Sequence, residues 1–200
     1  MQCGAINRAV SQLVFMKLSI FTRAAALAAL AIVGAPALAE EAQTETLAAA
    51  VVAVPSGSVL MADKLVVRKS TRRLYAMREG RILREFKVAL GLRPSGHKER
   101  EGDFRTPEGS YKLIRRNPRS DFFLSMEISY PNSTDLAHAQ RLGVRPGGAI
   151  MLHGWPNTPR KTADYYKSAD WTDGCIAVSN SDMVEIWLMT PIETPIEILP

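Results

Sequence analysis

Short runs in which hydrophobic and polar residues alternate begin near residue 64, and this period of two is typical of β-strands. The runs predict strands over residues 64–69, 73–77, 82–90, 111–114, 126–130, 149–152 and 195–199. Two segments have helical spacing instead, 135–142 with Thr134 as its N-cap and 181–189 with Ser181 as its N-cap. The pattern therefore predicts a mainly β fold with a few short helices.

Two long polar segments separate these elements. Residues 91–109 and 155–171 contain many glycine, proline and charged residues, so we expect both to be surface loops. Between them, the apolar run 149–152 ends directly at His153, as a buried strand does when it presents a polar side chain at its tip.

The first 39 residues have the three parts of a signal peptide. Lys17 and Arg23 precede the apolar run 24–33, which is shorter than the roughly 20 residues that span a bilayer, and residues 37–39 form a small-x-small cleavage site. We predict export to the periplasm with cleavage after Ala39. An uncleaved signal anchor is the alternative, and residues 1–15 suggest a mis-assigned start ahead of Met16.

The remaining chain divides into a linker over residues 40–58 and a single domain over 59–200. Cleavage would lower the formal net charge from 25 − 20 = +5 to 22 − 20 = +2, because Arg8, Lys17 and Arg23 leave without any acidic residue. The basic character thus belongs mostly to the export signal. Since the mature chain has no clustered basic residues with stacking aromatics, we do not expect nucleic-acid binding.

Cleavage would also remove Cys3 and leave Cys175 as the only cysteine. A lone cysteine in an oxidising compartment is either an inert buried residue or a reactive thiol. His153, at a predicted strand end, is a candidate base for this thiol, and Gly174 permits close backbone approach, so that nearby backbone N–H groups could form an oxyanion hole. Spacings such as CxxC or HExxH are absent, so we expect no metal and no cofactor.

The order of these motifs resembles the L,D-transpeptidase catalytic domain family of the YkuD type. The chain has His153-Gly154, then residues 172–178 (TDGCIAV), then Asp182 at the start of a helix. Residues 102–109 (GDFRTPEG) are similar to a loop found in many members, and residues 146–148 (PGG) are similar to the approach to the family's histidine. The resemblance covers residues 64–200.

This resemblance implies a single β-sandwich or barrel-like catalytic domain that acts on peptidoglycan in cell-wall biogenesis and cell shape. Cys175 would attack a tetrapeptide stem at its third residue, a diamino acid, expel the terminal D-Ala and hold the stem as a thioester, with His153 as the base. An amine then accepts the stem, on a second stem or a wall-linked lipoprotein. Two alternatives stay open: a hydrolase of the same fold that cuts stems or releases linked protein, and a non-catalytic peptidoglycan-binding domain.

The resemblance also assigns supporting roles around the thiol. Thr172, Asp173, Gly174 and Gly154 are the predicted support and oxyanion residues. Many members have a histidine before Gly-Cys and an arginine or asparagine soon after it, where this chain has Asp173 and Ala177. Other groups must then hold the substrate, and the candidates are Arg141, Arg145, Trp155, Tyr165 and Trp171.

Overall fold

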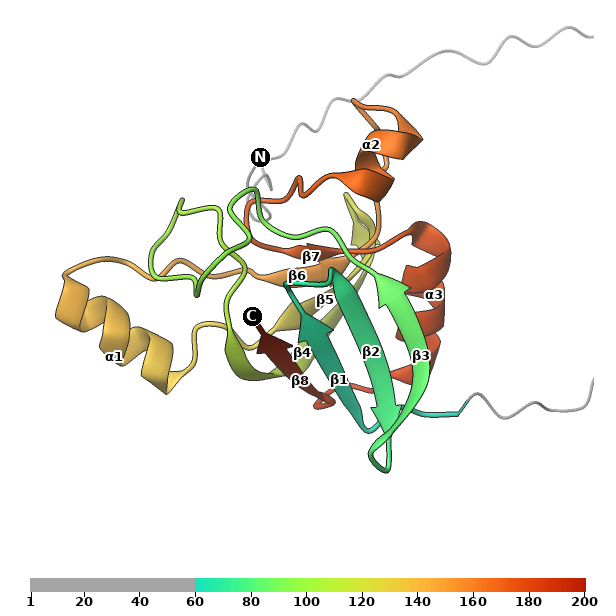
Figure 1. Ribbon diagram of the computed structural model, residues 1–200, viewed down its shortest axis with the longest axis horizontal. Helices are drawn as coiled ribbons and strands as arrows, with labels where there is room; N and C mark the ends of the chain where they lie inside the picture. Colours follow the sequence, from blue (N-terminus) through green and yellow to red (C-terminus); the bar gives the residue numbers. More distant parts are fainter. Residues whose placement is uncertain (1–59) are drawn as a thin grey trace, which may run out of the picture. The chain divides into compact units, whose positions relative to one another are not determined.

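The alternating runs form an eight-stranded sheet in the computed structural model, which describes residues 60–200 (Figure 1). The strands are β1 (Lys64–Arg68), β2 (Arg73–Arg78), β3 (Arg81–Lys87), β4 (Gly109–Ser120), β5 (Phe123–Ile128), β6 (Met151–His153), β7 (Ile176–Ala177) and β8 (Pro195–Leu199). Their order in the sheet is β3-β2-β1-β8-β4-β5-β6-β7. The predicted mainly β class is confirmed.

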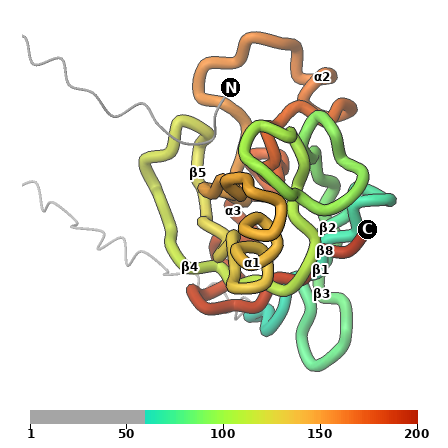
Figure 2. The backbone as a smooth tube through the Cα atoms, turned by 90° about the vertical axis from the view of Figure 1, so that its left-hand side faces the viewer, coloured from blue at the N-terminus to red at the C-terminus, as the bar shows by residue number. Residues whose placement is uncertain are grey.

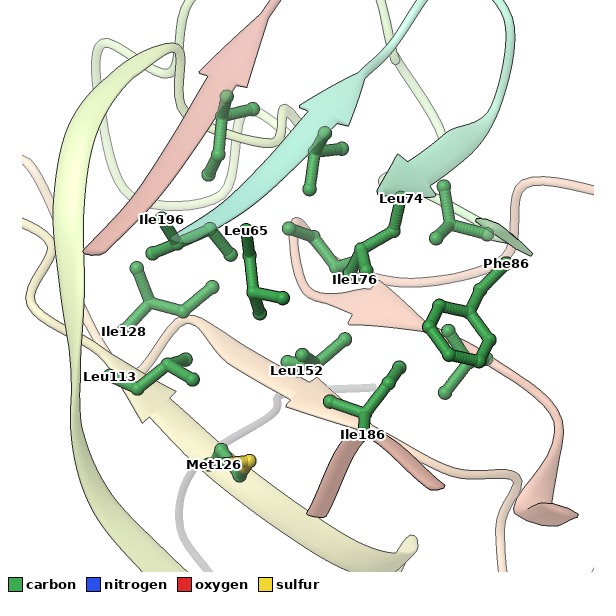
Figure 3. Packing of buried hydrophobic residues seen from close by; sticks show 14 of the residues in the cluster. Leu65, Leu74, Phe86, Leu113, Met126, Ile128, Leu152, Ile176, Ile186 and Ile196 are labelled. Carbon is green, nitrogen blue, oxygen red and sulfur yellow. The ribbon is translucent and has the colours of Figure 1, made fainter. Parts of the chain in front are cut away.

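The sheet is open but curved, so that its two ends approach each other. Backbone bridges join Ala89 to Ala177 and Gly91 to Thr172, which connects the segment after β3 with the region around β7. A single apolar core lies inside the curve, and Figure 3 shows Leu152 of β6 and Ile176 of β7 facing it. This closure brings the segment before β7 against the segment after β3, at the place where the candidate nucleophile lies.

Three short helices accompany the sheet: α1 (Ser133–Leu142), α2 (Ala163–Ser168) and α3 (Asn180–Met189). Of these, α3 supplies Ile186 to the core (Figure 3). The predicted N-caps Thr134 and Ser181 are wrong by two residues. Asn132 caps α1 by accepting from the backbone of Thr134 and Asp135, and Ser179 caps α3 by accepting from the backbone of Asp182. In both cases the short polar side chain that lies in extended backbone satisfies the first N–H groups of the helix.

The structure also corrects several predicted elements: β3 ends at Lys87 and not at residue 90, and β5 covers Phe123–Ile128 and not residues 126–130. Strand β4 extends to Ser120, well beyond the predicted residues 111–114, because its polar second half pairs with β5 across irregular register positions. Helix α2 lies within the predicted loop 155–171, where the Thr162 side chain caps a single helical stretch of six residues. The remainder of that segment has no regular structure, and a backbone bridge at Thr172 follows it.

The loop over residues 91–109 is ordered by buried charges. The Asp103 carboxylate accepts hydrogen bonds from Lys98 Nζ and from the backbone N–H groups of Glu99, Arg100 and Arg105. Burial alone would raise the pKa of Asp103, but these four hydrogen bonds outweigh it and lower the pKa. Figure 2 shows this loop in green beside α1. His97 Nε2 of the loop lies 3.2 Å from Asp135 Oδ1 of α1.

The predicted signal peptide, its cleavage after Ala39 and the linker 40–58 lie outside the described residues. Within residues 60–200, we find no helix with the length and apolar character needed to cross a membrane. The domain boundaries predicted for 59–200 stay a prediction.

Candidate active site

Cys175 lies directly before β7, beside the strand that ends in His153. Strands β6 and β7 are parallel, with Leu152 opposite Ile176 and His153 opposite Ala177. The same register continued by one residue places Cys175 opposite Met151. Its Sγ lies 3.4 Å from the Met151 backbone nitrogen, whose N–H points to it. The structure therefore brings the two predicted catalytic residues onto neighbouring strands and onto one face of the sheet.

The hydrogen bond of His153 determines which ring nitrogen can act as a base. His153 Nδ1 lies 2.6 Å from the Gly154 carbonyl oxygen. Because a carbonyl oxygen only accepts, Nδ1 carries the hydrogen, and the lone pair of the neutral ring is on Nε2. Burial lowers the pKa of His153 to about 4, and the hydrogen bond to Gly154 offsets only part of this effect. At neutral pH the ring is thus an uncharged proton acceptor.

Gly154 is placed where a side chain would not fit. Its N–H donates to the carbonyls of Phe122 and Leu124, and a Cβ at this position would come within 2.6 Å of Asn180 Oδ1. The Asn180 side chain in turn accepts from the Trp155 backbone N–H at 2.8 Å. The Gly154 carbonyl fixes the imidazole tautomer of His153, and its predicted supporting role in catalysis stays a prediction.

The turn that carries the thiol is organised by Thr172. The Thr172 hydroxyl donates to the Cys175 carbonyl at 2.7 Å and accepts from the Gly174 N–H at 3.2 Å. Gly174 has φ of 131°, and a Cβ there would lie 2.6 Å from the Arg105 carbonyl oxygen. The Gly174 N–H is engaged within the turn, so its predicted place in an oxyanion hole stays a prediction, as does the supporting role of Asp173.

A chain of aromatic rings extends from His153 into the segment 155–171. The His153 ring lies 4.7 Å from Phe122 and 5.7 Å from Trp171, measured between centroids. Trp171 contacts Tyr166 at 5.1 Å, and Tyr166 contacts both Trp155 and Tyr165. Three of the predicted substrate residues are therefore connected to the histidine through ring contacts. Among residues 60–200, the Trp171 Nε1–H is buried and has no hydrogen-bond partner, and the role of Trp171 in binding substrate stays a prediction.

The two predicted arginines lie elsewhere. Arg141, in α1, lines a cavity of about 660 Å³ together with His97, Asp135 and the carboxyl-terminal residue. Arg145 has a side chain that is 87% exposed and forms an ion pair of 2.9 Å with Glu101. The structure thus places both on the side of α1 and the loop 91–109, and their role in binding substrate stays a prediction.

Sequence reasoning missed three contributors to the site: Met151, Phe122 and Asn180. Met151 donates its backbone N–H to the sulfur, and Phe122 packs on the imidazole from the turn between β4 and β5. No local motif marks Phe122, because its contact with His153 depends on the pairing of β5 with β6. Asn180 has no local signal either, because its side chain meets Gly154 and Trp155 only through the fold.

The residue types that the structure brings together here are a cysteine and a histidine. A cysteine and a neutral, anchored imidazole on the same face of neighbouring strands are the residue types that thiol catalysis uses, and their catalytic roles stay a prediction. Within the described part of the chain, no group of three or more His, Cys, Asp or Glu side chains is arranged to hold a metal ion.

This mainly β domain, with a cysteine strand beside a strand that ends in histidine, has the architecture of an L,D-transpeptidase catalytic domain. A sequence model of the YkuD family, described as L,D-transpeptidase catalytic domain, matches residues 62–198. The chain belongs to this family.

Individual relatives agree with this assignment. The chain is 33% identical over 75 residues, 36% of its length, to a protein of Escherichia coli (strain K12) named "Putative L,D-transpeptidase YafK". It is similar in structure to the helical cell shape determining protein Pgp2 from Campylobacter jejuni, with TM-score 0.51, 27% identity and 67% of this chain covered. The matches cover only 28% of YafK and 46% of Pgp2, so this chain spans less than half the length of both.

We expect the His153 imidazole to titrate near pH 4, because its buried ring disfavours the positive charge. His153 in the unfolded chain binds this proton near pH 6.5. The contribution of the neutral, buried ring to the free energy of unfolding is therefore complete above that pH. It should fall by about 3 kcal/mol as the pH drops from about 6.5 to 4. Histidine NMR during an acid titration measures the midpoint, and the His153→Gln protein should lack this part of the stability slope. A midpoint at or above the ordinary value would contradict the prediction.

Proposed function

We propose that the protein is a periplasmic, cysteine-dependent acyl transferase that acts on peptidoglycan tetrapeptide stems. One observation carries this proposal: Cys175 Sγ lies against the backbone of β6, the strand that ends in His153. Membership of the L,D-transpeptidase catalytic domain family supports the same chemistry and the stem peptide as substrate. The predicted signal peptide supports the compartment.

The reaction proceeds in two halves. The Cys175 thiol gives its proton to His153 Nε2, and Sγ forms a bond to the carbonyl carbon of the third stem residue. The bond from that carbon to the nitrogen of the terminal D-Ala breaks, and the leaving amine takes the proton from His153. A thioester between the stem and Cys175 remains.

In the second half an amine attacks the thioester. His153 takes a proton from the attacking amine and returns it to the departing sulfur, while a new amide bond links donor and acceptor. Water in place of the amine would release the stem as a free acid, and the protein would then act as a carboxypeptidase or amidase. The two outcomes share every residue named above and differ only in the acceptor.

The decisive experiment identifies the products. The protein purified after export is incubated with tetrapeptide muropeptides, and both the muropeptides and the intact protein are followed by mass spectrometry. We expect a protein adduct equal to the stem minus D-Ala, and crosslinked dimers in solution.

Each other outcome points to a different function. Shortened monomers without dimers would replace transfer by hydrolysis. If neither product nor adduct forms and the protein only sediments with purified cell wall, the catalytic proposal is wrong and the chain is a binding domain.

A further inference from the structure

The sheet face that carries the catalytic pair continues as a polar surface across β5 and β4. Paired residues in neighbouring strands point to the same face. Glu127 pairs with Met151 in β6 and with Arg115 in β4, so one row runs from Cys175 through Met151 and Glu127 to Arg115. A second row runs from His153 through Ser125 to Asn117. The core face of the same strands carries Leu152 and Met126 instead.

A cavity of about 300 Å³ lies along these two rows. It is lined by Arg115, Arg116, Asn117, Ser125, Glu127 and Met151. The cavity lies next to Cys175, because Met151 lines the cavity and also donates its backbone N–H to Cys175 Sγ. A volume of this size is at the lower end of small-ligand sites. The cavity is therefore placed to hold a part of the molecule whose carbonyl is attacked by the thiol.

The charges in this cavity form an ion pair that a ligand can divide. Arg115 Nη2 and Glu127 Oε2 are 2.6 Å apart, with side-chain exposures of 70% and 21%. An ion pair with a partner this accessible to water contributes little to stability, so separating Arg115 from Glu127 costs little. The carboxylate of such a pair can accept hydrogen bonds from an ammonium group. The arginine can donate two hydrogen bonds to a carboxylate.

We propose that Arg115 and Glu127 form a specificity subsite for the zwitterionic end of the diamino acid in the donor stem. Glu127 receives the distal ammonium group and Arg115 receives the neighbouring carboxylate, so each opposite charge finds a partner. The inference rests on the proposed function, because it takes the scissile carbonyl to lie at Cys175. It names the feature of the stem that the protein recognises.

The distance favours the donor over the acceptor. Cys175 and Glu127 are two strand spacings apart, or about 10 Å, a gap that the diamino acid side chain and the Glu127 side chain span together. An amine bound to Glu127 stays protonated and away from the thioester, so it cannot attack. The amine held here therefore belongs to the stem that is already attached, and the acceptor must approach from elsewhere.

Calorimetry on the exported Cys175→Ala protein tests the subsite without turnover. The ligands are two tetrapeptide stems, one with diaminopimelate at position three and one with lysine, which has the distal amine but no carboxylate. We expect Glu127→Gln to weaken binding of both stems about tenfold or more, because it loses the charged acceptor. Arg115→Gln should weaken binding of the diaminopimelate stem by a similar factor and leave the lysine stem unchanged.

A matched control exists on the other side of the sheet. Arg73 and Glu85 form a diagonal cross-strand ion pair of 2.6 Å between β2 and β3. Arg73→Gln and Glu85→Gln should leave both affinities unchanged. Equal binding of the two stems, no binding of either, or an equal loss in the control variants would overturn the subsite. Turnover of both stems at equal rates would support the proposed function and contradict the subsite. Charge-dependent binding without any product would support the subsite and contradict the proposed function.

Discussion

Replacement of Cys175 by serine is expected to lower the rate of acyl-enzyme formation on tetrapeptide stems by about 10³-fold or more. A serine hydroxyl ionises far less readily than a thiol, and the neutral His153 is too weak a base to compensate. The substitution is nearly isosteric, so the hydroxyl keeps the place beside the Met151 N–H. The rate is measured as protein adduct and muropeptide product by mass spectrometry.

The control for this substitution is the stability of the fold. Cys175 is buried, so replacing it also changes the packing of the fold. Thermal unfolding of the Cys175→Ser and Cys175→Ala proteins should still show a folded domain in both, while activity is lost in both. Unchanged product formation in the serine protein would mean that the residue is a core thiol, and the catalytic proposal would fail.

Much of the fold could be predicted from local pattern. Strands β1, β2 and β8 are found within one residue of their predicted bounds, because each alternates apolar and polar residues against a single buried face. The strand that ends in His153 and the helix after the cysteine were also predicted. These elements are determined mainly by their own sequence.

Two of the errors lie where distant segments decide the structure. The second half of β4 (residues 115–120) is too polar to predict a strand, since its Arg115 and Asn117 face the cavity and only pairing with β5 makes it extended. Helix α2 has a single buried residue, Tyr166, so it carries no helical repeat of apolar positions. Both errors lie at the candidate site, where the sequence serves binding as well as folding.

The candidate site was predictable to the extent that its motifs are contiguous. The Thr172, Gly174 and Cys175 motif and the His153-Gly154 pair were found because each is a few adjacent residues. Arg115 and Glu127 have no such motif, because they meet only through strand pairing. The sequence therefore favours Arg141 and Arg145 as substrate residues, because they are near His153 in sequence. Strand pairing places Arg115 instead on the sheet face that carries Cys175.

Alanine at Gly174 is expected to lower the free energy of unfolding by about 3 kcal/mol and to reduce kcat strongly, since two effects coincide at this position. Its φ of 131° lies outside the regions that residues with a Cβ adopt, and the new Cβ would meet the Arg105 carbonyl oxygen at 2.6 Å. This carbonyl belongs to backbone and cannot rotate away. Relief of the clash must then move the turn that carries Cys175.

Gly80 provides the matched comparison. It lies in the turn between β2 and β3 with φ of 76°, and a Cβ there has nothing within 4 Å. Gly80→Ala should cost only about 1 kcal/mol, the usual penalty for a left-handed residue, and leave kcat unchanged. Thermal melts and kcat measured well below the melting temperature separate the two variants. Equal losses would mean that the close approach at Arg105 does not position the thiol, because the clash is the feature that Gly174 has and Gly80 lacks.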